Sequence, residues 1–330
     1  MRSMKVMLLT LPLLLTTAVL AGEPPFPVET DGKCGFGDRT GKLVIPCQFE
    51  EAVYFREGLA RVKQDGKWGF VDDKGTVKIA AQYDQAGDFY DGLARVGRKD
   101  GLVGHKYGFI NKEGKLVIGY EYTDGGNFSH DLARVKSDGK WGYIDKTGTM
   151  TIKPQFDEAA DFADGLARVK AGGDWGGKFG FIDNKGTFKV NPRFADCGHF
   201  NEGLAPVNID GKWGFINKTG EVIVQPQFAA ADTFSNSMAR VKVGKAYGFV
   251  EKAGSVAINP RFDDAKLFNE GMAAVKVDGK WGYVDVGGDL KIKPQFDEAG
   301  GFGDGIARVE VGKQSGWIDK TGKFVWPLSK

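Results

Sequence analysis

The chain has 330 residues, of which 42% are apolar and 27% are charged, a composition typical of a folded globular protein. The formal net charge is +2, and basic residues are spread evenly along the chain. A protein so close to neutrality has no long-range field that would attract nucleic acid or anionic lipid, so neither is expected as a partner.

Residues 1–21 have the layout of a secretory signal peptide. Arg2 and Lys5 precede an apolar run that extends to Leu20, and Ala21 offers a small residue at the cleavage position. The run is too short and too weakly flanked for a comfortable membrane span, although an N-terminal membrane anchor is the alternative. We expect a protein that is secreted or periplasmic, without a transmembrane anchor after cleavage, and with a short Pro-rich leader over residues 22–31.

One heptapeptide recurs along the rest of the chain. The segment 66–72, Gly-Lys-Trp-Gly-Phe-Val-Asp, returns with small changes at 139–145, 211–217 and 279–285, and five weaker copies occur. Neighbouring copies are 34 residues apart, except at two places where the spacing is longer. A fixed period of this size indicates an array of small units that bury their apolar faces against one another. We therefore expect about nine repeats within one domain over residues 32–330.

The unit that begins at Gly139 shows the local structure expected of every repeat. Residues 140–145 alternate in character and are rich in aromatic and β-branched residues, which predicts a strand. A turn closed by Gly148 leads to a second strand, which Pro154 is expected to end because proline has no N–H to donate. A third strand is expected over residues 166–169. Each unit is thus predicted to be a three-stranded antiparallel meander.

A second aromatic position is filled by phenylalanine in all eight units that reach it. Aromatic side chains bury about 150–250 Å² each, so we expect these rings to supply most of the core. A ladder of exposed rings that binds sugar is the alternative. The residues are Phe55, Phe89, Phe128, Phe162, Phe200, Phe234, Phe268 and Phe302.

The pattern G-K-W-G-[FY]-[IV]-D, followed by P-Q-F-D and later by G-L-A-R-V, resembles the WG (or KWG) repeat of bacterial proteins. The resemblance covers Gly32 to about Pro327. It implies an all-β interaction or surface module, and it brings no set of catalytic residues. The units could form a propeller-like ring or an open β-solenoid or superhelix. The two ends of the array do not complement one another, which slightly favours the open form.

The sequence advertises no catalytic, cofactor or metal site. The three histidines, His105, His130 and His199, fall in different repeat positions without metal-ligand spacing. The recurrent Asp-Lys-Thr-Gly turns place a lysine between the oxygen ligands that calcium would need. Abundant carboxylates could pair as in a glycosidase, but they mostly occupy repeated turn positions.

Cys34 and Cys47 replace the Trp and the Pro of other units, which suggests a disulfide in an exported protein. The bond is possible if the turn between their strands is the two residues Thr40-Gly41. With a three-residue turn the two side chains fall on opposite faces and cannot bond. Cys197 is expected to be a buried free thiol.

Two links between a Leu-Ala-Arg-Val strand and the next Trp-type strand are longer than usual. They run over residues 97–106 and 170–178, and because they occupy the same repeat position we expect both to project from one edge of the array. An exposed Trp is a plausible anchor for a partner. The alternative is tolerated growth of the surface. The candidate partner-binding residues are Arg98, Lys99, His105, Asp174 and Trp175.

These features favour an exported, non-catalytic repeat scaffold that binds a protein or a cell-envelope glycan. The alternative is a secreted carbohydrate-active hydrolase with its site at the ring centre or in a groove. An enzyme should show polar residues that break the repeat in adjacent units and converge in space.

The signal-peptide interpretation predicts cleavage after Ala21. N-terminal sequencing of the protein from its natural host should read Gly22-Glu23-Pro24. Recovery of cytoplasmic protein that still begins with Met1 would contradict export.

Overall fold

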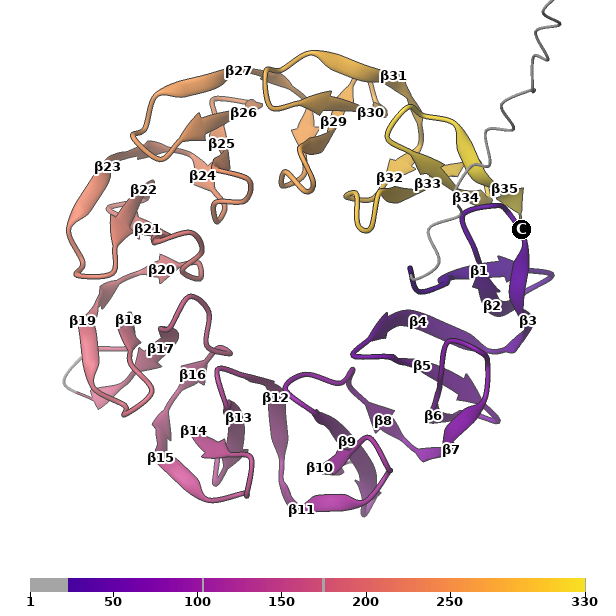
Figure 1. The fold of residues 1–330 in the computed structure, drawn as a ribbon. Coiled ribbons are helices and arrows are strands. Elements are labelled where there is room, and N and C mark those ends of the chain that lie inside the picture. The colour runs from indigo at the N-terminus through magenta and orange to yellow at the C-terminus, as the bar shows by residue number, and fades with distance from the viewer. Residues whose placement is uncertain (1–22, 103, 174–175, 330) are drawn as a thin grey trace, which may run out of the picture.

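A computed structural model describes residues 23–102, 104–173 and 176–329. The chain forms nine small antiparallel sheets arranged in a ring, a nine-bladed β-propeller (Figure 1). The expected all-β tandem array is confirmed, and its architecture is the ring instead of the open superhelix. The first and last blades lie side by side, so the ring is closed by contacts between the two ends of the domain.

The first blade has three strands, and the next four blades have four each. The first comprises β1 (Phe26–Thr30), β2 (Lys33–Gly37) and β3 (Leu43–Phe49). The second comprises β4 (Glu51–Arg56), β5 (Leu59–Gln64), β6 (Lys67–Val71) and β7 (Val77–Tyr83). The third comprises β8 (Gln85–Ala86), β9 (Leu93–Asp100), β10 (Gly104–Asn111) and β11 (Leu116–Tyr122). The fourth comprises β12 (Asp124–Ser129), β13 (Leu132–Ser137), β14 (Lys140–Asp145) and β15 (Met150–Phe156). The fifth comprises β16 (Glu158–Ala159), β17 (Ala167–Ala171), β18 (Lys178–Ile182) and β19 (Phe188–Phe194).

The last four blades repeat the four-stranded plan. The sixth comprises β20 (Asp196–Cys197), β21 (Leu204–Ile209), β22 (Lys212–Asn217) and β23 (Val222–Phe228). The seventh comprises β24 (Ala230–Ala231), β25 (Met238–Val243), β26 (Ala246–Glu251) and β27 (Val256–Phe262). The eighth comprises β28 (Asp264–Ala265), β29 (Met272–Val277), β30 (Lys280–Asp285) and β31 (Leu290–Phe296). The ninth comprises β32 (Glu298–Ala299), β33 (Ile306–Val311), β34 (Gln314–Asp319) and β35 (Phe324–Ser329).

The expectation of three strands per unit is wrong for the complete blades, which gain a short innermost strand. In the fifth blade this strand is β16, which pairs Glu158 with Lys170 and Ala159 with Val169. The sequence shows no periodicity over two residues, so the segment reads as a loop until its pairing partner is known. The inner strand lies nearest the ring axis, whereas strands such as β7 and β11 form the rim (Figure 1).

Blades and sequence repeats are out of phase. The link between β5 and β6 is the hairpin turn Asp65-Gly66, whose φ angles of 50° and 73° are those of a type I′ turn. The segments expected to connect neighbouring units are therefore hairpins inside a blade. Likewise β1 lies within residues 22–31, which were expected to be a leader. Its Phe26 and Val28 are buried on one face, as in a strand.

The glycine after the Trp position allows the outer strand of the blade to come close. A Cβ on Gly142 would lie 2.5 Å from the Ile152 carbonyl oxygen, so only glycine allows the outer strand to approach this closely. Pro154 does not end the strand as expected. β15 continues to Phe156 through two register shifts, and the proline lies in the bulged part, where a missing N–H is tolerated.

The two-residue turn on which the expected disulfide depended is wrong. Gly37 pairs with Leu43, and two register shifts then place Phe49 opposite Cys34. Cys34 packs toward the second blade, whereas Cys47 packs on the cluster shared with the ninth blade. The side chains therefore lie on opposite faces of the sheet, and both cysteines are free thiols in this structure. Cys197 is a buried free thiol, and burial raises its pKa.

Each junction between consecutive blades, from the first to the ninth, is held by a pair of aromatic rings. The repeated phenylalanine of one blade packs against an aromatic side chain of the preceding blade, with centroids 4.6–5.0 Å apart. All eight phenylalanines are at most 9% exposed. The expectation that these rings form the core is confirmed, and an exposed sugar-binding ladder is not formed by them.

Truncating one of these phenylalanine side chains should destabilise the propeller strongly. Phe200→Ala removes a side chain that is 1% exposed and should lower the free energy of unfolding by about 3–5 kcal/mol. Phe324→Ala removes a ring that is 38% exposed and lies 6.5 Å from Phe296 of the eighth blade. This looser ring contact is the control, and its loss should cost less than half as much. Urea unfolding followed by circular dichroism gives both values. Equal losses would contradict the role of the inter-blade ring pair.

Candidate binding site

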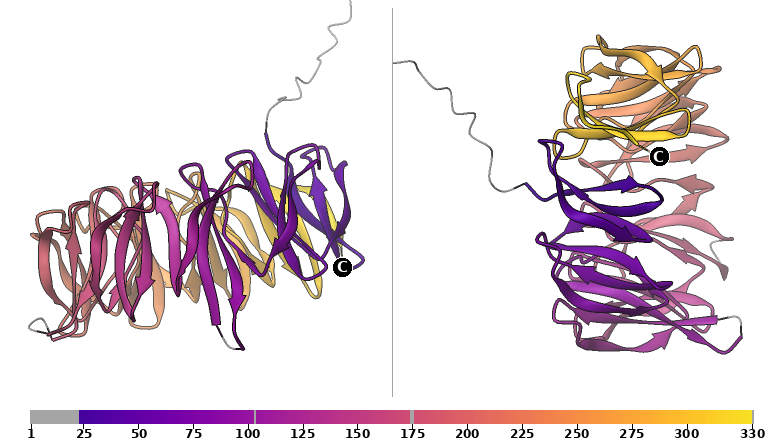
Figure 2. Two further views of the ribbon diagram at one scale, coloured as in Figure 1. Left: turned by 90° about the horizontal axis from the view of Figure 1, so that it is seen from below. Right: turned by 90° about the vertical axis from the view of Figure 1, so that its right-hand side faces the viewer.

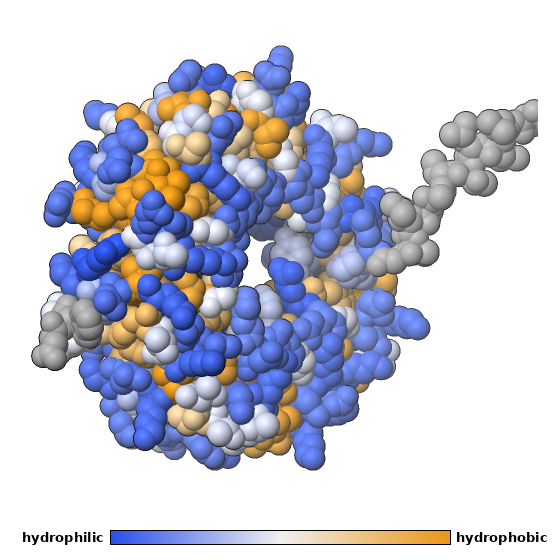
Figure 3. Space-filling model, turned by 60° about the vertical axis from the view of Figure 1, so that its left-hand side comes forward, coloured by the Kyte–Doolittle hydropathy of each residue, from blue (hydrophilic) through white to orange (hydrophobic). Residues whose placement is uncertain are grey.

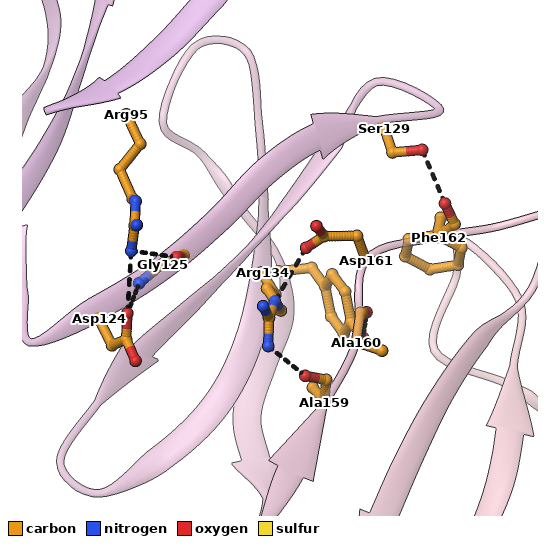
Figure 4. A network of polar contacts seen from close by, with 10 residues as sticks. Arg95, Asp124, Gly125, Ser129, Arg134, Ala159, Ala160, Asp161 and Phe162 are labelled. Atoms are coloured by element: carbon orange, nitrogen blue, oxygen red, sulfur yellow. Dashed lines mark hydrogen bonds and ion pairs between the residues drawn. The ribbon is translucent and has the colours of Figure 1, made fainter. Parts of the chain in front are cut away.

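The arginine of the Leu-Ala-Arg-Val strand joins one blade to the next. Arg95 donates to the Gly125 carbonyl at 2.6 Å and to Asp124 Oδ1 at 3.0 Å. Arg134 donates in the same way to the Ala159 carbonyl at 2.7 Å and, through Nε, to Asp161 at 2.8 Å (Figure 4). The acceptors lie on or beside the innermost strand of the following blade. The same bridge to a backbone carbonyl is formed by Arg61, Arg168 and Arg240.

The junction between the ninth and first blades cannot form this bridge, because the first blade has no innermost strand among the described residues. Arg308 of β33, at the equivalent position, bonds instead to Glu310 on its own strand. Its side chain is 46% exposed, compared with 26% for Arg168.

Two side chains of the last blade take over the bonds of the missing strand. In the third blade, the backbone N–H groups of Asp84 and Gly87 donate to the carbonyls of Gly97 and Arg95. The equivalent carbonyls of the first blade belong to Glu29 and Pro27. Ser329 Oγ donates to the Glu29 carbonyl at 2.7 Å, and Trp317 Nε1 donates to that of Pro27 at 3.1 Å.

An aromatic cluster completes this closing junction. The Trp317 ring lies 5.1 Å from the Phe26 ring and 5.7 Å, edge to face, from that of Tyr54. Tyr54 belongs to β4 of the second blade, so this strand contributes a side chain to the junction between the ninth and first blades. Three blades thus meet at one indole ring.

A cavity of about 230 Å³ remains at the closing junction. It exists partly because the Trp position is filled by Cys34 in the first blade and by Ser315 in the ninth, where the other seven blades have an aromatic ring. The residues that line it include Glu29, Arg308, Tyr54 and Trp317. Pockets for drug-sized ligands measure about 300–1,000 Å³, so this one suits a side chain with a little backbone.

A second cavity of about 410 Å³ lies where the fourth, fifth and sixth blades meet at the inner side of the ring. Its polar residues are Arg134, Asp161, Arg168 and His199. Burial, followed by the nearby Arg168 charge, lowers the pKa of His199, so the imidazole is neutral at pH 7. Asp161 is held by Arg134, and the cavity contains no second carboxylate. This arrangement offers polar contacts but no acid–base pair.

The structure places three candidate residues from the sequence on the β9–β10 hairpin. The additional residues there extend the hairpin instead of forming a loose loop, with Lys99 paired to His105 and Arg98 to Lys106. The Arg98 guanidinium lies 4.5 Å from the Tyr120 ring centre, and the Lys99 N–H donates to Asp84 at 2.8 Å. Arg98 and Lys99 are exposed, and His105 is half-buried.

Leu102, at the end of this hairpin, is fully exposed, with a relative accessibility of 104%. The sequence interpretation passed over it because a lone leucine in a polar link carries no pattern. Asp174 and Trp175 lie outside the described residues. The β9–β10 and β17–β18 hairpins point to the same side of the ring, as their common repeat position predicted (Figure 2).

The described residues contain no group of three or more His, Cys, Asp or Glu side chains that could hold a metal ion. The recurrent turn carboxylates cap their own turns. Asp145 Oδ1 accepts from the N–H groups of Thr147 and Thr149 at 2.9 and 3.0 Å. No helix within the described ranges is long and apolar enough to cross a membrane.

Sequence reasoning missed the closing junction. Its residues come from opposite ends of the domain, with Pro27 and Trp317 separated by 290 positions. The one available signal was the loss of the aromatic ring at Cys34 and Ser315.

Comparison with known proteins identifies the repeat. The family described as "WG containing repeat" matches eight times between residues 35 and 314, so the chain belongs to this family. The matched segments are 35–68, 68–102, 107–141, 141–175, 179–213, 213–245, 247–281 and 281–314. No curated protein matches the chain.

Solved structures resemble the chain only distantly. The dihydro-heme d1 dehydrogenase NirN is 11% identical, with 81% of this chain and 72% of that chain covered at a TM-score of 0.46. Hsv2 from Kluyveromyces lactis is 8% identical, with 83% and 95% covered at a TM-score of 0.41. An extracellular domain from B. thetaiotaomicron (BT4673) is 10% identical, with 90% and 52% covered at a TM-score of 0.40. These likenesses carry no information about activity.

The indole N–H of Trp317 should contribute measurably to ring closure. Trp317→Phe leaves the Pro27 carbonyl without its donor and should lower the free energy of unfolding by about 1–3 kcal/mol more than Trp281→Phe. The two indoles are matched, since each is 4% exposed but Trp281 Nε1 has no hydrogen-bond partner. Chemical denaturation of both variants measures the difference. Equal destabilisation would show that the indole hydrogen bond does not support closure.

Proposed function

We propose that this WG-repeat protein is an exported, non-catalytic scaffold that binds a partner through the β9–β10 hairpin. The observation that carries the proposal is the length of this hairpin. β9 and β10 have eight residues each, whereas the corresponding β13 and β14 have six. The ring itself stays regular on either side, so the hairpin is an addition that the fold does not need.

The chemistry of the hairpin favours a protein partner. Leu102 presents a fully exposed apolar side chain at the end, and Arg98 and Lys99 present positive charge beside it. An apolar contact surrounded by charged groups suits a protein surface with an apolar patch and acidic neighbours. A cell-envelope glycan is the other partner class, but its usual platform is an exposed aromatic face, and Tyr120 is covered by Arg98.

Export is proposed from the N-terminal segment alone. Its basic start, apolar run and small residue before Gly22 have the order of a secretory signal.

A hydrolytic function receives less support from the cavities. Glycoside hydrolysis generally requires two carboxyl groups that flank the scissile bond. The cavity at the closing junction has Glu29 and the inner cavity has Asp161, one carboxylate each. We therefore propose a binding role for the protein.

Shortening the hairpin should abolish partner capture and leave the ring intact. Arg98 pairs with Lys106 as Gln64 pairs with Lys67, and Asp65-Gly66 joins the latter pair. Replacing residues 99–105 by Asp-Gly thus restores an ordinary hairpin. Immobilised wild-type and shortened proteins are compared for capture from the envelope fraction of the natural host, quantified by mass spectrometry.

The control replaces Gly244-Lys245, the turn of the ordinary β25–β26 hairpin, by the same Asp-Gly pair. We expect this control to capture the partner at the wild-type level, and the shortened variant to lose at least tenfold with an unchanged circular dichroism spectrum. Capture at full strength by the shortened variant would exclude the hairpin as the binding site.

A further inference from the structure

The complete blades show which contacts an innermost strand makes. The described part of the first blade has no such strand, and we call the position that it would occupy, beside β1, the slot. In the second blade, the innermost strand places Glu51 opposite Lys63 and Ala52 opposite Val62. The fifth blade places Glu158 opposite Lys170 and Ala159 opposite Val169. In both blades the acidic and basic side chains form an ion pair, at 2.7 and 2.9 Å. In these two blades the first inner-strand residue is matched in charge to the strand beside it, whereas the ninth blade places Glu298 opposite Glu310.

The first blade reverses this charge. Counting back one repeat from Lys63 and Val62 gives Glu29 and Val28. Glu29 is exposed and lines the cavity at the closing junction. A residue placed opposite Glu29 in the same register would need a positive side chain to form the equivalent ion pair.

The opposite wall of the cavity supplies the second recognition group. Arg134 and Arg168 each donate to the carbonyl of the second inner-strand residue of the following blade, Ala159 and Cys197. Arg308 has the equivalent position but donates to Glu310 instead of to an inner-strand carbonyl. A carbonyl at the inner-strand position would complete the bridge that the other junctions have.

We propose that this slot binds an extended segment of a partner protein in which a basic residue is followed by a small one. The basic side chain pairs with Glu29, the small residue lies beside Val28, and its carbonyl accepts a hydrogen bond from Arg308. The segment acts as the missing innermost strand, a strand addition at a sheet edge.

The slot contains a cavity beside the edge of β1, and this edge has two carbonyls that the bound segment would use. Cys34 and Ser315 leave the cavity of about 230 Å³ that aromatic rings would otherwise fill. The two edge carbonyls accept hydrogen bonds from the side chains of Ser329 and Trp317, so binding of the segment requires both side chains to move. Backbone N–H groups of the bound segment would replace these two donors, so one hydrogen bond is exchanged for another.

The test measures binding of fluorescent hexapeptides with the core Gly-Lys-Ala-Gly or Gly-Glu-Ala-Gly by anisotropy. It uses the full chain and a chain that begins at Gly22, because residues 17 and 18 lie one 34-residue period before Glu51 and Ala52 in the sequence. We expect the lysine peptide to bind about two- to fivefold more tightly than the glutamate peptide. Glu29→Lys should reverse this preference, and Arg308→Met should weaken both peptides.

Lys170→Glu, at the equivalent position of a complete blade, is the matched control and should leave both affinities unchanged. The variant with the shortened β9–β10 hairpin should also bind as the wild type does, which separates this slot from the proposed function. Tighter binding of the lysine peptide than of the glutamate peptide to the chain that begins at Gly22 supports the proposal. This holds whether or not residues 17 and 18 compete with the peptide in the full chain. Absence of binding to that chain, equal binding of both peptides, or a preference that Glu29→Lys does not reverse would overturn the proposal.

Discussion

The ring depends on one repeated contact, in which a phenylalanine of each blade packs against an aromatic side chain of the preceding blade. Phe162 follows the inner strand of its own blade and packs against Tyr143 of the preceding blade. The two ring centres are 5.0 Å apart. Arg134 crosses the same junction to the Ala159 carbonyl. A blade is therefore incomplete until its successor is in place, which is why single units cannot bury their apolar faces alone. The 34-residue period follows from this requirement, since every unit must present the same groups at the same step.

The ninth blade has no following blade in the chain, so it must pack against the first. The ninth blade needs a partner, and the described residues of the first blade include neither an inner strand nor a phenylalanine at that position. Trp317 compensates with the ring contacts to Phe26 and Tyr54, and its N–H caps the exposed strand edge. The space-filling view shows that the ring retains an opening at its centre (Figure 3). Regularity thus explains the scaffold, and binding is proposed at two of the departures from it, the β9–β10 hairpin and the closing junction.

The sequence was informative wherever a residue acts within its own repeat. The phenylalanine positions and the turn at Asp145 both follow from local patterns. The inner strands escaped prediction because Glu158-Ala159 is too short to show a period. The Cys34–Cys47 pairing failed because bulges in β3 shift the register by residues that no pattern marks. Closure joins Glu29 to Ser329, and the sequence marks it only by the loss of the aromatic ring at Cys34 and Ser315.

Closure of the ring is the central claim, and the distance between its first and last blades tests it most directly. A Cβ on Gly41 would lie 3.1 Å from the Val325 carbonyl oxygen, so the neighbouring exposed residues Lys42 and Lys323 mark the two sides of the junction. Spin labels at these positions, in a variant without the native cysteines, report their separation by pulsed electron paramagnetic resonance. A closed nine-bladed ring gives one short, narrow distance distribution. An open superhelix would give a long or broad one.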